Sequence, residues 1–422
     1  MGEYREFENV IGYEDVKAEL IRICDVLRFP EKYKKLGVVS PRGVMLYGDP
    51  GIGKTLLAKS FIKECGRTSF TIRRDKPNGA FVDEIREIFT KAGNEAPSII
   101  LLDDLDKFAN EDCYHKDAEE YVAVQSCIDG LKEKEVFVIA TVNDKSELPE
   151  SLMRAGRFDK VIEMRNPQGE DAEKIIRFYL KDKKTVADVD TGEIARIMDG
   201  RSCAELEAVI NEAGIYAAYS GKDLIEQEDI IKACMRVIFN APECINPKEV
   251  RYLDKIAVHE AGHTVTSEIL EPGSVNLVSV QRYSGNVEGF TDYKRNEDSF
   301  MLRETKECEI IRLLGGRAAV EIVYGTIDMG SETDLSKAFA IEQKLIDDIC
   351  LFGFDTYDDI TGAEILMSKR SSIIANEIER LYLEAKKILA DNRSFLDNVA
   401  AELLARQTLT CKDIAAIKDR IS

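Results

Sequence analysis

The stretch 43–62, GVMLYGDPGIGKTLLAKSFI, limits the possible folds of this chain more than any other part of it. It contains Gly48-x-x-x-x-Gly53-Lys54-Thr55, directly after an apolar run of strand length and directly before a helical pattern. A glycine-rich loop in this context folds its backbone around phosphates, with its N–H groups pointing inward. Lys54 would supply a cation to the β- and γ-phosphates, and the Thr55 hydroxyl could ligate Mg²⁺. The stretch therefore predicts a strand, a phosphate loop and a helix that together bind a nucleotide.

The order of the other patterns predicts several domains. Apolar strand-like runs alternate with helical patterns up to about residue 165, which favours a parallel α/β sheet. Strand patterns are missing from 171–240, where Ser202 and Glu205 form a capping-box pattern that opens a helix. Segment 240–250 contains two prolines and is a candidate linker to a third, mainly helical part. We expect domains at residues 1–168, 169–243 and 244–422.

Composition excludes some partners. The formal net charge of −20, without a marked basic patch, disfavours nucleic acid as a partner. The longest apolar runs, such as 136–142, have strand length, so no membrane span is expected in this chain. Ten scattered cysteines without a Cys-x-x-Cys pair favour a reducing compartment. We expect a cytoplasmic protein, with membrane association only if an N-terminal anchor lies outside this sequence.

Two further apolar strands end in polar side chains. SIILLDDLDKF carries Asp103 and Asp104; a carboxylate at a strand tip can hold Mg²⁺, and its neighbour can orient the attacking water. VFVIATVND ends in Asn143, a neutral polar group that could also fix this water. LMRAGRFDKVIEM follows with Arg154 and Arg157. Each feature alone is compatible with a solvated strand end or ordinary surface charge, but beside a phosphate loop they favour nucleotide hydrolysis.

These motifs together resemble the AAA+ ATPase module over residues 7 to about 240. In that family, Asn143 matches the sensor position, and Arg154 and Arg157 match two arginines that reach the nucleotide of the neighbouring subunit. The resemblance implies ATP and Mg²⁺ as cofactors and a ring, usually a homo-hexamer.

The opening segment of the chain is also similar to that family. FENVIGYEDVKAEL looks like the segment in which the backbone of Ile11 and Gly12 borders the adenine. The residues expected to bind the nucleotide are Ile11, Gly12, Gly48, Asp49, Pro50, Gly51, Ile52, Gly53, Lys54, Thr55, Leu56 and Asp103.

The chain departs from the family in two places. Asp104 stands where the family usually has glutamate, and a misplacement of about 1 Å can cost on the order of a hundredfold in rate. This predicts slow ATP hydrolysis unless the backbone compensates for the shorter side chain.

The stretch that matches the central pore loop reads KPNGAFVDEI. Pro77-Asn78-Gly79 supplies no aromatic residue, and Phe81 comes two residues late. Weak threading of stable substrates is therefore expected.

The stretch VHEAGHT places His259, Glu260 and His263 in the pattern His-Glu-x-x-His. On a helix, residues four apart lie on one face, so the two imidazoles can bind one Zn²⁺. Glu260 can then take a proton from a water that the metal activates and later deliver it to a leaving amine. The alternative is two surface histidines, but apolar neighbours favour a buried helix, where an unligated pair would be costly. The pattern predicts a metal hydrolase.

A catalytic zinc normally has three protein ligands and one open position. His115 is the third and last histidine of the chain, and it lies in a polar stretch of the ATPase half. The remaining ligand is therefore expected to be a carboxylate. The sequence alone offers Glu268, Glu271, Asp328, Glu332 and Asp334, and it does not choose among them.

The phosphate loop, RAGRFD, a helical lid and HEAGH in one chain resemble the FtsH family of ATP-dependent zinc metalloproteases. LLGGRAAVEIVYG at 313–325 is similar to that family's glycine-arginine helix. MGSETDLSKA at 329–338 is similar to the segment that donates the third zinc ligand, which puts this role on Asp334, with Glu332 as the alternative. The resemblance implies an α/β AAA+ P-loop NTPase core with an α-helical lid, followed by a mainly α-helical zinc peptidase domain.

Three functions are compatible with these patterns. The leading hypothesis is a zinc endopeptidase that cleaves polypeptides delivered through an ATP-driven ring. In the second, the peptidase is largely uncoupled from ATP hydrolysis, as the Asp104 and pore-loop departures suggest. The third is an AAA+ remodeller in which zinc is structural or absent.

Between the zinc segments, residues 274–293 alternate like strands around a glycine-marked turn. In the family that the chain resembles, an edge strand in this region pairs with extended substrate.

Overall fold

The fold is seen in a computed structural model of the 422-residue chain. The chain packs as two compact units, Met1–Glu226 and Gln227–Ser422, and each is described by itself. The structure describes residues 4–74, 78–108, 119–131, 133–154, 156–241, 252–283, 287–294, 302–353 and 364–421.

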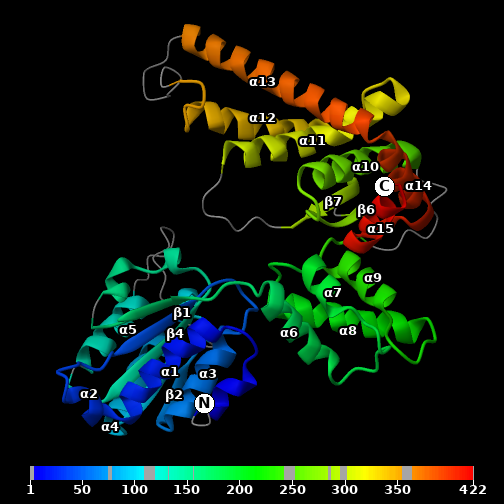
Figure 1. The fold of residues 1–422 in the computed structure, drawn as a ribbon. Helices are drawn as coiled ribbons and strands as arrows, with labels where there is room; N and C mark the ends of the chain where they lie inside the picture. The colour runs from blue at the N-terminus through cyan, green and yellow to red at the C-terminus, as the bar shows by residue number, and fades with distance from the viewer. Residues whose placement is uncertain are drawn as a thin grey trace. The chain divides into compact units, whose positions relative to one another are not determined.

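The first unit is built on a five-stranded sheet in the order β2-β3-β4-β1-β5 (Figure 1). All neighbouring strands are parallel, so the predicted parallel α/β sheet is confirmed. The strands are β1 (Gly43–Tyr47), β2 (Thr68–Ile72), β3 (Ser98–Leu102), β4 (Val136–Val142) and β5 (Lys160–Glu163).

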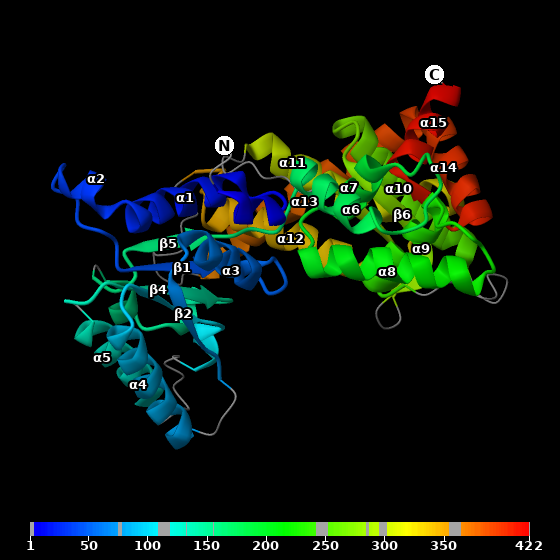
Figure 2. The same ribbon diagram turned by 90° about the horizontal axis from the view of Figure 1, so that it is seen from below.

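Helices cover both faces of this sheet, which is why its central strands read as continuous apolar runs. Successive residues of β1 point to opposite faces: Leu46 packs in a core with α1 and α3, and Met45 packs in a core with α4 and α5. Figure 2 shows α1 and α4 on opposite sides of the sheet. The α-helices of this layer are α1 (Glu14–Arg28), α2 (Pro30–Lys34), α3 (Lys54–Cys65), α4 (Asn78–Asn94) and α5 (Glu119–Gly130). Short 3₁₀ helices are η1 (Arg5–Asn9), η2 (Leu105–Lys107), η3 (Lys145–Glu147) and η4 (Glu150–Met153).

Three further helices of this unit follow β5: α6 (Gly169–Leu180), α7 (Thr191–Ile197) and α8 (Cys203–Tyr219). The predicted capping box is confirmed at the start of α8, where the Ser202 side chain accepts from the backbone N–H of Glu205. The Ala204 N–H donates to the carbonyl of Gly51 at 3.0 Å. The capped end of α8 therefore lies directly against the phosphate loop.

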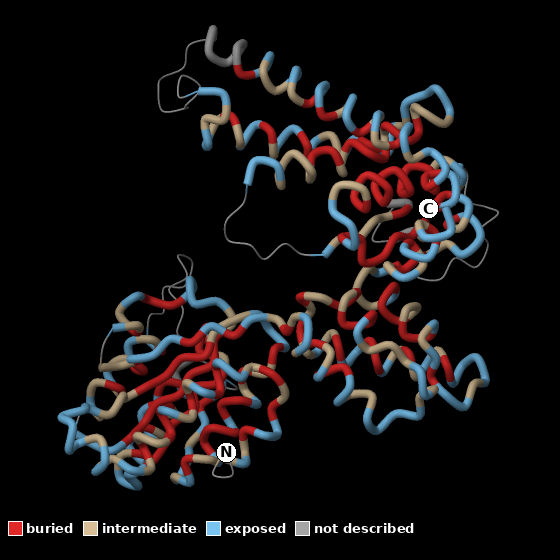
Figure 3. The backbone as a smooth tube through the Cα atoms, in the orientation of Figure 1, coloured by how far each residue is buried: buried red, intermediate tan, exposed pale blue. Residues whose placement is uncertain are grey.

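The second unit is mainly helical and contains a small antiparallel sheet in the order β7-β6-β8. Its core is formed chiefly by α10, α11, α13 and α14. Figure 3 shows α10 buried along most of its length. The elements are α9 (Gln227–Val237), α10 (Leu253–Leu270), β6 (Val275–Tyr283), β7 (Val287–Tyr293), α11 (Arg303–Tyr324), α12 (Glu332–Asp347), α13 (Glu364–Asp391), α14 (Arg393–Arg406), β8 (Thr408–Thr410) and α15 (Cys411–Ile421).

Glycines bring α10 and α11 into close contact. A Cβ atom on Gly262 would lie 2.4 Å from the carbonyl oxygen of Gly315, closer than atoms can approach. A Cβ on Gly315 would lie 2.5 Å from Thr266 Oγ1. The backbones of the two helices thus meet at the level of the His-Glu-x-x-His segment.

Some sequence predictions lie outside the described residues: His115, Pro77 of the pore-loop stretch, and residues 242–250 of the candidate linker. The boundaries at 168/169 and 243/244 stay predictions; the two compact units divide between Glu226 and Gln227. Across the part of the chain that the structure describes, no helix is both long enough and apolar enough to cross a membrane.

Candidate functional site

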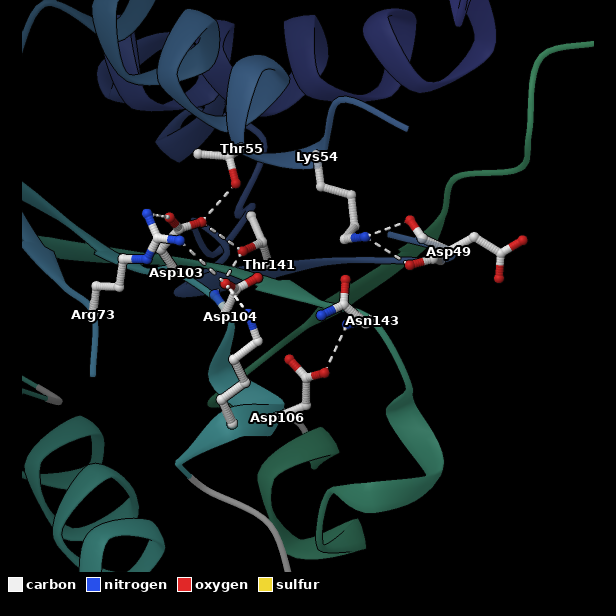
Figure 4. Close-up of polar contacts among 11 residues, drawn as sticks. Asp49, Lys54, Thr55, Arg73, Asp103, Asp104, Asp106, Thr141 and Asn143 are labelled. Carbon is white, nitrogen blue, oxygen red and sulfur yellow. Dashed lines mark hydrogen bonds and ion pairs between the residues drawn. The ribbon is translucent and has the colours of Figure 1, made fainter. Parts of the chain in front are cut away.

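The phosphate loop, residues 48–55, connects β1 to α3 and depends on glycine. Gly51 and Gly53 have φ angles of 80° and 94°, which side-chain-bearing residues rarely adopt. The Lys54 amine lies inside the loop and donates to the carbonyls of Gly48 at 2.6 Å and Asp49 at 2.7 Å (Figure 4). Burial lowers the pKa of Lys54. A buried cation surrounded by backbone groups suits a phosphate ligand.

Hydrogen bonds connect the loop to the predicted Mg²⁺ ligand. Asp103, at the end of β3, is buried and accepts from the Thr55 hydroxyl at 2.7 Å and from the Thr141 hydroxyl at 2.8 Å. Figure 4 shows Thr55, Asp103 and Thr141 in one chain of contacts. The sequence analysis missed Thr141; the signal available was a hydroxyl in an otherwise apolar strand, two residues before Asn143.

Asp104 has a left-handed backbone, with φ 56°, and its carboxylate is paired with cations. Lys107 Nζ lies 2.6 Å and the Arg73 guanidinium 3.7 Å from Asp104 Oδ2. Figure 4 places Arg73 beside both Asp103 and Asp104. The sequence analysis named neither Arg73 nor Lys107.

Asn143 lies at the end of β4, where its backbone N–H donates to Asp106 Oδ2 at 3.1 Å. Asp106 is buried, and it too was missed, although it belongs to the same acidic run as Asp103 and Asp104. Its carboxylate connects η2, which follows β3, to the residue after β4 (Figure 4).

A cavity of about 380 Å³ lies between the phosphate loop and helices α6 and α8. Ile11, Asp104 and the loop from Gly51 to Leu56 line it on one side. Gly12, with φ 72°, lies near α6, since a Cβ on it would lie 3.1 Å from the carboxyl carbon of Asp171. The remaining lining residues were not among the predicted nucleotide-binding residues. They are Asn9, Val10, Tyr13, Ile175, Phe178, Tyr179, Cys203, Ala204 and Glu207.

The two predicted arginines differ in their surroundings. Arg154 is exposed. Arg157 is mostly buried, lies 2.8 Å from Asp129 and donates to the carbonyl of Ser151. Arg157 is therefore held within its own unit in this structure.

The second unit brings together the side chains predicted to bind zinc. One ligand atom each from His259, His263 and Asp334 lies within 4.8 Å of the other two. The two Nε2 atoms are 3.0 Å apart, and Asp334 Oδ2 lies 3.4 Å from that of His259 and 3.3 Å from that of His263. A tetrahedral zinc ion separates neighbouring ligand atoms by about 3.3 Å. The donor types and spacings thus fit one zinc ion.

An oxygen atom also lies close to the outward nitrogen of each ring. His263 Nδ1 lies 2.7 Å from the carbonyl oxygen of Arg312 on α11. His259 Nδ1 lies 2.7 Å from Asp328 Oδ2. Both rings therefore direct Nε2 toward Asp334.

Glu260 is buried next to this cluster. Its Oε2 accepts from the Thr291 hydroxyl of β7 at 2.8 Å. Gly289, also on β7, leaves room for the carboxylate: a Cβ there would lie 2.8 Å from Glu260 Oε1. A Cβ on Gly316 of α11 would lie 2.6 Å from Nε2 of both His259 and His263.

Comparison with protein families matches three successive parts of the chain. Residues 44–166 match the ATPase family associated with various cellular activities (AAA), and residues 188–232 match the AAA+ lid domain. Residues 248–417 match peptidase family M41.

Similar proteins match nearly the whole chain. The chain is 31% identical to "ATP-dependent zinc metalloprotease FtsH 2" of Thermoanaerobacter sp. (strain X514), over 97% of this chain and 82% of that protein. It is 32% identical to the protein of the same name in Symbiobacterium thermophilum, over 97% of this chain and 74% of the other. The chain is also 30% identical to "ATP-dependent zinc metalloprotease FtsH" of Thermotoga maritima, over 97% of this chain and 72% of that protein.

The chain belongs to the FtsH family of ATP-dependent zinc metalloproteases. Membership confirms the predicted fold class: an α/β AAA+ core with a helical lid, then a mainly helical peptidase region. It also implies Zn²⁺, ATP and Mg²⁺ as cofactors, in agreement with the phosphate loop and with the cluster of His259, His263 and Asp334.

The other carboxylates considered as FtsH zinc ligands lie elsewhere. Glu268 accepts from the N–H groups of Gly273 at 2.8 Å and Val275 at 3.0 Å, so it organises the turn before β6. Glu271 lies 3.5 Å from Arg312, and Glu332 is exposed. Asp328 contacts the outward nitrogen of His259 instead of the cluster.

The side chains of His259, Asp328 and Asp334 shift one another's pKa values. Burial lowers the pKa of His259, but the carboxylates of Asp328 and Asp334 outweigh it and raise this pKa to about 10. Burial opposes ionisation of Asp334 as well, yet hydrogen bonds from both imidazoles hold its pKa below the usual range. Burial raises the pKa of Glu260. A buried carboxylate with a raised pKa suits a group that must take up a proton.

Proposed function

We propose that this chain hydrolyses internal peptide bonds of polypeptides, with zinc held by His259, His263 and Asp334 and with Glu260 as the general base. The observation that carries the proposal is the convergence of three zinc-type ligand atoms beside a buried glutamate. When bound, zinc acts as a Lewis acid that polarises the scissile carbonyl and lowers the pKa of a water molecule.

The residues around Glu260 prepare it for proton transfer. Thr291 holds one oxygen by a hydrogen bond of 2.8 Å, and Gly289 keeps the space beside the other oxygen free. Glu260 takes a proton from the attacking water and passes it to the leaving amine. Burial supports the first of these steps, since it stabilises the protonated form of Glu260.

Strand β7 supports polypeptides as the substrate class. It is the terminal strand of the order β7-β6-β8, and it carries both Gly289 and Thr291 beside Glu260. An extended peptide can add to such an edge through main-chain hydrogen bonds, which give little side-chain specificity. A substrate bound along β7 would therefore pass the proposed base.

The proposed motor is a homo-hexameric ring of three-domain subunits, with boundaries near residues 168 and 243. Asp103 holds Mg²⁺ with Thr55, Asp104 activates water, Asn143 fixes it, and Arg154 and Arg157 act on the neighbouring subunit's nucleotide. The exposure of Arg154 supports this role, whereas Arg157 would first have to leave its ion pair with Asp129.

Arg154→Ala should lower ATPase activity while ATP binding persists. Native mass spectrometry with ATP should give six subunits, and a stable monomer at the active concentration would contradict the ring.

The proteolytic proposal is tested with an unstructured casein-like substrate, zinc and ATP. Glu260→Gln keeps the acceptor for Thr291 but removes the base, so cleavage should fall by at least about a hundredfold. Glu332→Gln, at an exposed acid of the same unit, is the matched control and should cleave normally. Equal cleavage by Glu260→Gln and the unmodified chain would refute the assigned base.

A peptidase largely uncoupled from ATP hydrolysis is the second candidate, because the short Asp104 carboxylate is paired with Lys107 at 2.6 Å. In this case, short or disordered peptides are cleaved equally fast with ATP and with a non-hydrolysable analogue. A collapse of the rate with the analogue would exclude this candidate and favour the coupled protease.

A further inference from the structure

The connection between α11 and α12 and the first turn of α12 each place a carboxylate near one ring nitrogen of His259. Asp334, in the first turn of α12, lies 3.4 Å from Nε2, and Asp328, six residues earlier, lies 2.7 Å from Nδ1. The two carboxylates thus lie at opposite nitrogens of one imidazole. Only one of these nitrogens can face the metal.

The geometry decides which nitrogen this is. Nε2 of His259 points to Nε2 of His263 and to Asp334, and the three atoms form the zinc-type cluster. Nδ1 points away from it, toward Asp328. A negatively charged carboxylate oxygen 2.7 Å from Nδ1 attracts a proton to that nitrogen, so Asp328 favours the tautomer with the proton on Nδ1 and the lone pair on Nε2.

The two rings differ in the charge of their outer partner. The outer nitrogen of His263 meets a neutral carbonyl, that of Arg312, at 2.7 Å. The outer nitrogen of His259 meets a carboxylate, which makes the ring a stronger electron donor toward a metal. The Asp328 side chain is only 19% exposed, so water screens its charge weakly.

We propose that Asp328 is a positioning residue of the metal centre, which fixes the tautomer and orientation of His259 and strengthens its bond to zinc. The inference rests on the proposed function, since it requires zinc at His259, His263 and Asp334. Asp328 itself does not bind the metal. Outer-shell partners of this kind typically contribute about 10- to 100-fold in metal affinity.

The test measures zinc affinity of the full-length chain by competition with a chromogenic chelator. Asp328→Ala should bind zinc about 10- to 100-fold more weakly, and Asp328→Asn, which keeps an acceptor oxygen without the charge, should recover part of the loss. Glu332→Gln removes an exposed acid at the start of α12, and the zinc affinity of this variant should stay within about twofold of that of the unmodified chain. The ATPase rate of each variant reports whether the chain is folded.

The possible outcomes separate the inference from the proposed function. An unmodified chain without zinc would refute the metal centre itself. Zinc binding that is unchanged in Asp328→Ala would overturn only the role of Asp328. An equal loss in Asp328→Ala, Asp328→Asn and Glu332→Gln would also overturn it, because it would indicate a general effect of charge. If Asp328→Ala does not fold, the near-isosteric Asp328→Asn decides, and unchanged affinity there contradicts the inference.

Discussion

Gly316 shows how strictly a single residue limits the metal centre. Its missing side chain leaves the space that the rings of His259 and His263 occupy, since a Cβ would lie 2.6 Å from both Nε2 atoms. The atoms that such a Cβ would meet belong to rigid imidazole rings, and an oxygen lies 2.7 Å from the outer nitrogen of each ring, so neither ring can move aside without losing this contact. A methyl group at this position must therefore displace the two histidines proposed to bind the metal.

Gly316→Ala should abolish stoichiometric zinc binding and proteolysis while the chain stays folded. Gly130→Ala is the matched control, because a Cβ on Gly130 meets no atom within 4 Å. Metal analysis of the purified variants checks this. One tightly bound zinc in Gly316→Ala would contradict the described packing.

Asp106 is the corresponding case at the nucleotide site. It is buried and accepts from the N–H of Asn143, so it keeps the end of β4 next to the end of β3. Asp106→Asn retains an oxygen acceptor but adds an amide that lacks the charge facing Lys54.

For Asp106→Asn we expect a turnover number for ATP reduced by about tenfold, with a smaller change in KM, because positioning acts on the reacting atoms more than on binding. Steady-state ATPase assays measure both. The same two quantities are measured in Asp129→Asn, which changes a carboxylate that contacts Arg157, and are compared with those of Asp106→Asn. An unchanged turnover number in Asp106→Asn would exclude a positioning role.

At the scale of elements, the predictions that succeeded depend on neighbours in sequence. The capping box at Ser202, the phosphate loop and the pair of histidines on one helix each need only local spacing. Thr141, Thr291 and Asp328 were not assigned to their partners, because Asp103, Glu260 and His259 lie 31 to 69 residues away in the chain. Local periodicity carries no information about which element packs beside which.

The choice of Asp334 among five carboxylates illustrates the same limit. Spacing along the chain gave no preference, and the family resemblance supplied the choice. In the structure, Glu268 is engaged with backbone N–H groups and Asp328 with the outer nitrogen of His259, which leaves Asp334 facing the cluster. Only three-dimensional packing distinguishes these roles.

Helix α8 connects lid stability to nucleotide binding. Ser202 caps the helix, and in the same first turn the Ala204 N–H donates to the carbonyl of Gly51 in the phosphate loop at 3.0 Å. Ser202→Ala should destabilise the helix by about 1 kcal/mol and weaken ATP binding several-fold. Ser220→Ala, at the exposed far end of α8, should do neither. Thermal melting and nucleotide titration measure the two effects, and unaltered ATP affinity in Ser202→Ala would contradict the connection.

At the scale of the whole molecule, the two ligand sites lie in different compact units, the nucleotide loop in Met1–Glu226 and the metal cluster in Gln227–Ser422. A ligand stabilises the unit that binds it, by about 2.7 kcal/mol at a hundred times its Kd. Each site should therefore respond to its own ligand.

Removal of zinc with a zinc-selective chelator, in excess Mg²⁺, should raise hydrogen exchange in α10, α11 and α12 and leave β1 and α3 unchanged. Addition of ATP should protect β1 and α3. Exchange measured by mass spectrometry resolves the two units. Loss of ATP-dependent protection in the zinc-free chain would contradict independent sites.

The central claim is that His259, His263 and Asp334 hold one zinc ion. Anomalous diffraction from crystals of the zinc-loaded chain, measured on both sides of the zinc absorption edge, tests it most directly. We expect one strong peak per chain at bonding distance from both Nε2 atoms and from the Asp334 carboxylate. No peak there, or a zinc bound by Asp328 or Glu332 instead of Asp334, would contradict the account.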